Sequence, residues 1–211
     1  MSSPRRIGTE TSKTRAVLVD AAEQLMLEEG YAAVTSRRVA AKAQLKPQLV
    51  HYYFRTMDDL FLAIHRRRVE QGLERQARAL ASDQPLWALW DYSRDPRGTA
   101  LTMEFIALAN HRKAIRAEIA ASAELFRVEQ VSGFSRLLEQ HGIRSEEIPP
   151  IVCAVLLSSI SRFLGIEHEA LGMSRGHAET VAFVEGFIRR LEGDRAIARA
   201  EEPVHAITIA D

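Results

Sequence analysis

The sequence predicts an all-α protein, with an N-terminal three-helix helix-turn-helix domain followed by a larger helical domain. Three observations support this fold class. Ala, Leu, Arg and Glu, which all favour helices, are abundant. No long alternating run of Val, Ile and Thr is present, so no sheet is expected. Apolar residues instead recur at spacings of three and four, which places them on one face of a helix.

The first helix is expected over residues 12–29. Gly30 follows it and would end it, because glycine readily adopts the backbone conformation found just after a helix. The expected apolar face consists of Leu18, Ala21, Ala22, Leu25 and Met26.

Two short helices should follow, separated by a tight turn. Thr35 is a good N-cap for the first of them. Pro47 would begin the second, since its missing N–H is unpaired at a helix start in any case. Val50 and Phe54 lie four apart and would be its buried residues. Two short helices joined in this way are typical of the helix-turn-helix motif.

The outward side chains of the second short helix are basic, amide and aromatic, with no acid among them. In a helix-turn-helix this helix lies in the DNA major groove, where Gln can read adenine and Lys can reach guanine. Arginines at the start of the preceding helix are placed to hold phosphates, and its threonine cap could share its hydroxyl with one. The predicted DNA-binding residues are Thr35, Arg37, Arg38, Lys46, Pro47, Gln48, His51, Tyr52 and Tyr53.

The formal net charge of zero hides an asymmetry along the chain. Residues 1–68 carry 12 Lys and Arg against 7 Asp and Glu, a net charge of +5, and residues 69–211 carry 16 against 21, a net charge of −5. A basic N-terminal third suggests contact with a polyanion. The alternative is chance combined with solvated charged faces.

The remaining chain continues the helical pattern. Thr56 is the expected cap of a long helix to about residue 80, with Asp58 and Asp59 in its first turn, where the helix dipole favours acids. The expected domains are residues 1–55 for DNA binding, 56–192 for regulation and dimerisation, and 193–211 as a tail. Further helices are expected near 85–94, 98–110, 112–141, 149–171 and 174–192.

The first 65 or so residues resemble the DNA-binding domain of the tetracycline-repressor (TetR) family of bacterial regulators. The resemblance rests on AAEQLMLEEGYAAVTSRRVA (21–40) and LVHYYFRTMDDLFLAI (49–64). Three residues depart from the family pattern: Gln44 stands where glycine is usual in the turn, His51 where tyrosine is frequent, and Met57 where lysine is frequent. Gln44 would need a left-handed backbone there, and the usual phosphate contacts of the other two positions are in doubt.

The resemblance implies a homodimeric repressor that binds double-stranded operator DNA, typically palindromic, and leaves it when a small apolar or amphipathic effector binds among helices four to eight. The last two helices would pair with those of a second subunit. Residues 178–191 agree independently, since they are apolar around more than one face. A fully buried helix of a monomer is the alternative. The predicted interface residues are Leu156, Ile160, Val181, Val184, Phe187 and Ile188.

The effector pocket is the least defined prediction. Arg162 lies among apolar neighbours and could orient a carboxylate, or could pair with a glutamate at the subunit interface. An aromatic residue with this pattern is more often ordinary core than part of a pocket. The predicted lining residues are Trp87, Trp90, Phe105, Asn110, His111, Phe126 and Phe134.

Other classes of protein are disfavoured. Cys153 lies in an apolar helix with no histidine nearby in sequence, and His168 and His177 do not have a metal-binding spacing, so neither an enzyme nor a cofactor or metal site is expected. Residues 151–166 are too short and too polar to span a bilayer, and a single cysteine suits the cytoplasm. A helix-turn-helix activator or an architectural DNA-binding protein remains the alternative function.

Overall fold

The structure, a computed structural model, describes residues 13–196, and these residues are all helical or connecting, with no strand. The all-α prediction is therefore confirmed for this part of the chain. A single 3₁₀ turn, η1 (Tyr31–Ala33), accompanies the α-helices. These helices are α1 (Lys13–Glu29), α2 (Ser36–Lys42), α3 (Pro47–Tyr53), α4 (Met57–Leu80), α5 (Pro85–Ser93), α6 (Pro96–His111), α7 (Lys113–Gln140), α8 (Pro150–Leu171) and α9 (His177–Glu192).

Local signals set the helix boundaries. Thr56 forms a full capping box with Asp59: the Asp59 N–H donates to the Thr56 hydroxyl at 3.1 Å, and the Thr56 N–H donates to the Asp59 carboxylate at 2.9 Å. Helix α6 begins at Pro96, two residues before the expected start, because the Asp95 side chain caps it. Helix α9 begins at His177 instead of residue 174, because the preceding Gly176 has a positive φ of 83°.

A first hydrophobic core holds the N-terminal domain together and continues beyond it. Val50 and Phe54 are buried in it, as the sequence predicts. Phe61 of α4, Phe105 of α6 and Ile115 of α7 belong to the same core. The three N-terminal helices are therefore packed directly onto α4 and α6, without a flexible boundary of the kind that separates independent domains.

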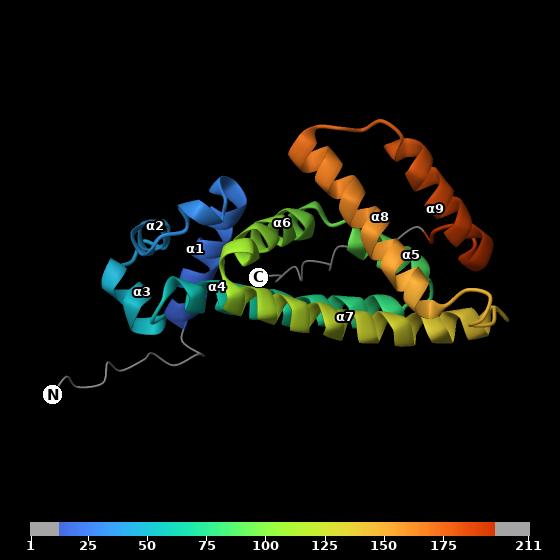
Figure 1. The fold of residues 1–211 in the computed structure, drawn as a ribbon, viewed down its shortest axis with the longest axis horizontal. Helices are drawn as coiled ribbons and strands as arrows, with labels where there is room; N and C mark the ends of the chain where they lie inside the picture. The colour runs from blue at the N-terminus through green and yellow to red at the C-terminus, as the bar shows by residue number, and fades with distance from the viewer. Residues whose placement is uncertain (1–12, 197–211) are drawn as a thin grey trace, which may run out of the picture.

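A second core lies at the opposite end of the molecule and joins α5 to parts of α4, α7, α8 and α9. Between the two cores α4 and α7 lie side by side (Figure 1). Their close approach depends on glycine, because a Cβ on Gly133 would come within 2.3 Å of the Leu80 side chain. The expected C-terminal tail, 193–211, lies mostly outside the described residues.

Helices α8 and α9 lie on the side of the molecule away from α3 and slant in the same direction in this view (Figure 1). Helix α8 is long and apolar enough by composition to cross a membrane. It is not a membrane span, because Ser158, Ser161 and Arg162 bring polar groups to one of its faces, which lines an internal cavity. The apolar side chains exposed on the two helices include Val152, Val155, Leu156, Phe163, Phe183 and Phe187.

Candidate DNA interface and effector cavity

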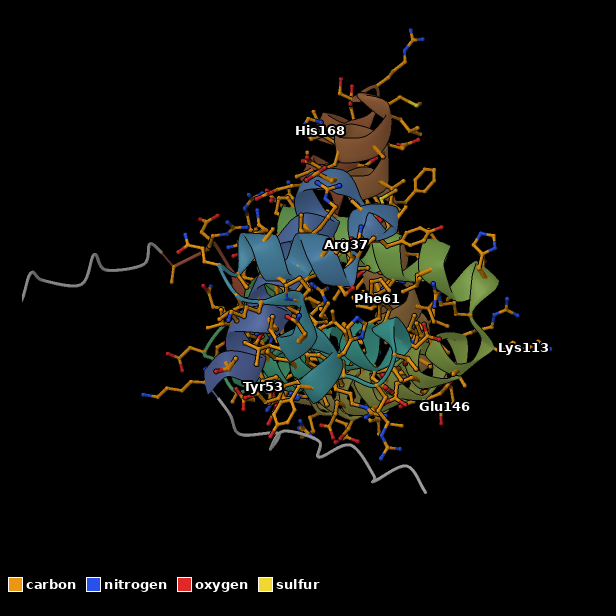
Figure 2. The ribbon with its side chains drawn as sticks, turned by 90° about the vertical axis from the view of Figure 1, so that its left-hand side faces the viewer. Arg37, Tyr53, Phe61, Lys113, Glu146 and His168 are labelled. Carbon is orange, nitrogen blue, oxygen red and sulfur yellow. The ribbon has the colours of Figure 1, made fainter. Side chains whose placement is uncertain are left out.

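Helix α3 is anchored by two side chains and leaves the rest of its surface open. Val50 and Phe54 are 1% and 2% exposed. Tyr53 is half-buried against the first core, so it presents only part of its ring. Figure 2 views the molecule from this end, with Arg37 and Tyr53 on the N-terminal domain nearest the viewer and Phe61 in the interior behind it. The exposed residues at and along α3 are Lys46, Pro47, Gln48, His51 and Tyr52, as predicted.

The turn before α3 has the backbone geometry that the sequence predicts. Gln44 has a φ of 55°, in the left-handed region that usually favours glycine. Its N–H donates to the Ala41 carbonyl at 3.1 Å, and the Leu45 N–H donates to the Ala40 carbonyl at 2.9 Å. These two bonds form a Schellman motif, which satisfies the last carbonyls of α2 and aims the chain into α3.

The basic residues of α2 are not all equally available to DNA. Arg38 forms an ion pair with Glu29, and its hydrogen bond to that carboxylate lowers the pKa of Glu29. Lys42 pairs with Glu28 at 2.6 Å. Arg37 is exposed and has no ion pair among the described residues. Glu28 and Glu29 were not anticipated as partners, although their position at the end of α1 is visible in the sequence.

Thr35, also predicted to contact DNA, is committed first to helix capping. Its hydroxyl accepts a hydrogen bond from the Arg38 N–H at 3.4 Å. The side chain is exposed, so its hydroxyl hydrogen is free to point outward. A capping threonine can therefore also donate to a phosphate oxygen.

A cavity of about 650 Å³ lies between α4, α6, α7 and α8. Its volume is in the range of small-molecule sites, about 300–1,000 Å³. Phe105 and Phe126, predicted to contact the effector, both line it.

The other five predicted effector residues lie elsewhere. Trp87, Trp90 and Phe134 are buried in the second core. Asn110 and His111 are exposed at the end of α6. Sequence reasoning placed them in the pocket because of their aromatic or polar character, which is the same for a core residue, a surface residue and a cavity residue.

Buried polar side chains form part of the cavity wall. Gln76 is 1% exposed; its amide nitrogen donates to the Phe126 carbonyl at 3.2 Å, while its Oε1 has no partner among the described residues. His65 Nε2 lies 2.9 Å from the Ser122 hydroxyl, which itself donates to the Glu118 carbonyl. That hydroxyl therefore accepts from His65. Burial, and after it the charge of Arg68, lower the pKa of His65, which favours the neutral ring.

Polar contacts tie the cavity region to the DNA-binding helices. The buried Glu23 of α1 accepts hydrogen bonds from Arg67 at 2.8 Å and from Arg97 at 2.7 Å. Burial raises the pKa of Glu23, but its bonds to the two arginines outweigh burial and leave that pKa below its ordinary value. Both Glu23 and Arg97 line the cavity.

Two further contacts join α6 to the N-terminal domain. The Glu104 carboxylate accepts from the Tyr31 N–H at 2.7 Å, and Arg112 pairs with Asp58. Together with the Glu23 bonds, they fix α6 against α1, η1 and the start of α4.

The remaining polar side chains of the described residues offer no metal-binding cluster. Within residues 13–196 no cluster of three or more His, Cys, Asp or Glu side chains could hold a metal ion. His177 instead pairs with Glu167 at 2.9 Å. Burial raises the pKa of the Cys153 thiol, which makes it a poor nucleophile.

The described residues combine a helix-turn-helix with a larger helical region that holds a cavity. Residues 18–64 match the sequence model of the bacterial regulatory proteins of the tetR family. The N-terminal helix-turn-helix therefore matches the DNA-binding region of the TetR family of bacterial regulators, and the described residues share the fold of solved TetR-family transcriptional regulators.

Solved structures of regulators have the same fold. A putative transcriptional regulator from Saccharomonospora viridis, in complex with choline, superposes with a TM-score of 0.71 at 20% identity over 85% of this chain and 97% of that chain. A TetR transcription regulator from Haloarcula marismortui gives 0.68 at 18% identity over 83% and 95%. The regulator FadR from Bacillus subtilis, in complex with stearoyl-CoA, gives 0.64 at 13% identity over 85% and 99%. No curated protein matches the chain in sequence.

Proposed function

We propose that the protein is a dimeric repressor that binds a palindromic operator through α3 and releases it when a small molecule fills the cavity between α4, α6, α7 and α8. The observation that carries this proposal is the continuity of α4. Its first residues pack on the DNA-binding helices, and its middle lines the cavity. Two structurally similar regulators hold choline and stearoyl-CoA, which supports a small-molecule effector for this fold.

Base reading is assigned to the N-terminal part of α3. Gln48 is exposed in the first turn, and Lys46 immediately precedes the helix. This end of the recognition helix enters the groove in helix-turn-helix proteins. Arg37, Arg38 and Tyr53 are assigned to the phosphate backbone, with Arg37 the more available of the two arginines because Arg38 is paired with Glu29.

The second subunit is assigned to the exposed apolar faces of α8 and α9. Leu156 and Phe187 are exposed there, which suits an interface. Ile160, Val181 and Val184 are half-buried against the second core of their own chain. Ile188 is 4% exposed in that core, so it supports the interface from beneath and does not face a partner.

We assign the release of DNA by the effector to the ion pair between Glu23 and Arg97. A ligand that draws Arg97 into the cavity weakens this tie and lets α1 shift relative to α6. In a dimer such a shift changes the separation of the two α3 helices, which must match half-sites about 34–36 Å apart. The ligand and DNA then reduce each other's affinity by the same factor.

A pair of substitutions measured on DNA tests the assignment of α3. Gln48→Ala should cost about 1–3 kcal/mol on the cognate operator and relax the preference at one base pair. Arg37→Ala should instead weaken binding to all sequences alike, and each phosphate that the variant no longer neutralises should reduce the salt slope by about one. The measurement is fluorescence anisotropy on operator and random duplexes across a salt series.

Arg144→Ala is the control for these two variants. Arg144 lies in the exposed connection between α7 and α8, so its replacement should leave DNA binding unchanged. If Gln48→Ala lowered the affinity for operator and random DNA equally, Gln48 would be a backbone contact and α3 would be docked differently.

A further inference from the structure

The cavity between α4, α6, α7 and α8 carries a surplus of positive charge. Six arginines and three carboxylates line it, an excess of three positive charges with histidine neutral. The acids are Glu23, Glu74 and Asp95, and the arginines are Arg68, Arg75, Arg78, Arg97, Arg127 and Arg162. This surplus contrasts with residues 69–211, which supply most of the lining and are acidic overall.

Two of the three acids already have arginine partners. Glu23 accepts from Arg97 at 2.7 Å and also from Arg67, which lies outside the lining. Asp95 accepts from Arg75 at 3.3 Å. Their charges still act on Arg68 through space, but neither acid forms a hydrogen bond or ion pair with it.

Two lining arginines have no acidic partner among the described residues. Arg68 donates only to the Gly98 carbonyl, at 3.3 Å. Arg162 forms no hydrogen bond or ion pair within residues 13–196, and the charge that affects it is that of another arginine, Arg127. Burial lowers the pKa of both guanidinium groups, and for Arg162 the like charge of Arg127 lowers it further. Arg68 is half-buried, whereas the side chain of Arg162 is exposed, so desolvation bears mainly on Arg68, whose charge a counter-charge in the cavity would stabilise.

Both arginines lie on helices that approach the start of α6. Arg68 is bound to the carbonyl of Gly98, at the start of α6. Helix α8 touches α6 at the next residue, because a Cβ on Gly165 would lie 3.0 Å from the Thr99 side chain. Arg162 is one helical turn before Gly165, so α8 and α4 bring their arginines to the same end of α6.

The rest of the lining is suited to an apolar group. Phe105 and Ile106 of α6 and Ile119 and Phe126 of α7 line the cavity together with Val69 of α4. A small anion without an apolar group would not contact these side chains. An uncharged apolar molecule would leave the arginines without a counter-charge.

We propose that the effector is an amphipathic anion: a carboxylate or phosphate group held by Arg68 and Arg162, attached to an apolar chain or ring that contacts the aromatic wall. The proposal rests on the proposed function, because it assigns the chemical class of the ligand to the same effector cavity. Arginine is suited to this role, since its planar fork can donate two parallel hydrogen bonds to either head group.

The experiment titrates the full-length protein with matched ligands by isothermal calorimetry. A decyl and a naphthylmethyl group each carry in turn a carboxylate, a phosphate, a hydroxyl or an ammonium group. With at least one of the two apolar groups, the carboxylate or the phosphate compound should bind at least tenfold more tightly than the matching alcohol. The ammonium compound should bind most weakly. The carboxylate and phosphate arms distinguish the two head groups. If no anion binds more tightly than its neutral counterpart, the proposal is overturned.

Substitutions locate the anion. Arg162→Gln should lower the affinity for the preferred anion at least tenfold and leave the affinity for the matching alcohol unchanged. Arg68→Gln should do the same, which provides a second test if one variant fails to fold. Arg144→Gln, which is exposed and outside the cavity, is the matched control and should have no effect. An equal loss for anion and alcohol would contradict the assignment.

Two further readouts separate this proposal from its alternatives. Arg162→Gln should remain dimeric in sedimentation; if it dissociated, Arg162 would be an interface residue and not an anion ligand. DNA binding in the absence of ligand should be unchanged in both variants. If the protein bound its operator in a salt-dependent way but the cavity did not prefer anionic ligands, only the proposed ligand class would be rejected. The proposed DNA-binding function would still hold.

Discussion

Single residues in the N-terminal domain show how closely the DNA interface is constrained. Gln44 holds a left-handed backbone in the turn, so that α2 ends and α3 begins at the required angle. Arg38 is held by Glu29 in the free protein, so a phosphate must compete with a carboxylate for it. Both features affect DNA binding without any base contact.

Replacing Gln44 by glycine should stabilise the protein slightly. A non-glycine residue in the left-handed region costs roughly 1–2 kcal/mol, and the greater unfolded-state freedom of glycine offsets about 0.5–1 kcal/mol of the gain. Gln44→Gly should therefore raise the free energy of unfolding by about 0–1.5 kcal/mol, measured by urea denaturation. Gln44→Val is the matched control and should destabilise, because a branched side chain tolerates this backbone poorly. A valine variant as stable as the parent would contradict the argument.

Replacing Glu29 by glutamine should tighten binding to all DNA sequences. The substitution releases Arg38 and removes a negative charge near the phosphates. The affinity for operator and random DNA should rise equally, and the salt slope should steepen by about one in each half-site. Glu146→Gln removes an exposed acid far from α3 and should change neither quantity. A gain confined to the operator would show that Glu29 affects base reading.

At the scale of elements, α6 is the link between the cavity and the DNA-binding helices. Its start contributes Arg97 to Glu23, its middle contributes Glu104 to the Tyr31 N–H, and Arg112 just after its end pairs with Asp58. A displacement of α6 therefore acts on α1, η1 and α4 together.

Glu23→Gln should destabilise the link between α1, α4 and α6. The substitution leaves Arg67 and Arg97 without their shared carboxylate, and we expect a cost of about 1–3 kcal/mol in urea unfolding at neutral pH. Asp20→Asn removes a more exposed acid that also pairs with Arg67, and should cost less than about 1 kcal/mol.

The pH dependence provides a check on the same residue. The pKa of Glu23 in the folded protein is below its ordinary value of 4.5. The ionised Glu23 carboxylate therefore contributes its full share to the free energy of unfolding above the ordinary pKa of 4.5. This contribution is lost as the pH falls through the lowered pKa of the folded state. The stability difference between the parent and Glu23→Gln should narrow below about pH 4.5. A difference that stayed constant down to the acid unfolding transition would show that Glu23 is not held ionised.

At the scale of the whole molecule, the two ends present different kinds of surface. Helix α3 and its neighbours present a basic, aromatic and amide surface, while α8 and α9 present exposed apolar side chains at the other end (Figure 1). An apolar surface of this kind is typical of contact with another protein chain. In the dimer proposed above, pairing of two subunits there would leave both copies of α3 free for two half-sites.

Introducing a charge into the exposed faces of α8 and α9 should separate the subunits. Phe183 and Phe163 are 74% and 60% exposed, so Phe183→Glu and Phe163→Glu disturb little in a single chain. Both should halve the molar mass found by sedimentation equilibrium and weaken operator binding, because one half-site alone is then read. Leu125→Glu, at an exposed apolar position on α7, should remain dimeric. If both phenylalanine variants stayed dimeric, the interface would lie elsewhere.

The sequence by itself determined the parts of this protein that depend on local patterns. Apolar spacing, Thr35, Thr56 and Pro47 were sufficient to predict the helices and the open surface of α3, because capping and the burial of Val50 and Phe54 depend mainly on near neighbours. The left-handed backbone of Gln44 was predicted from the family resemblance, in which glycine is usual at that position. Only the tertiary structure decided which side chains line the cavity and which pair with one another.

The physical reason is that contacts between distant residues leave no periodic signal. Trp90 and Phe126 are both aromatic, but packing of α5 puts the first into a core and packing of α7 against α4 puts the second on the cavity wall. Ile188 is apolar like Phe187, yet the orientation of α9 buries one and exposes the other. Arg68 and Arg162 are far apart in the chain, and only the packing of α4, α6 and α8 puts both on the lining of one cavity.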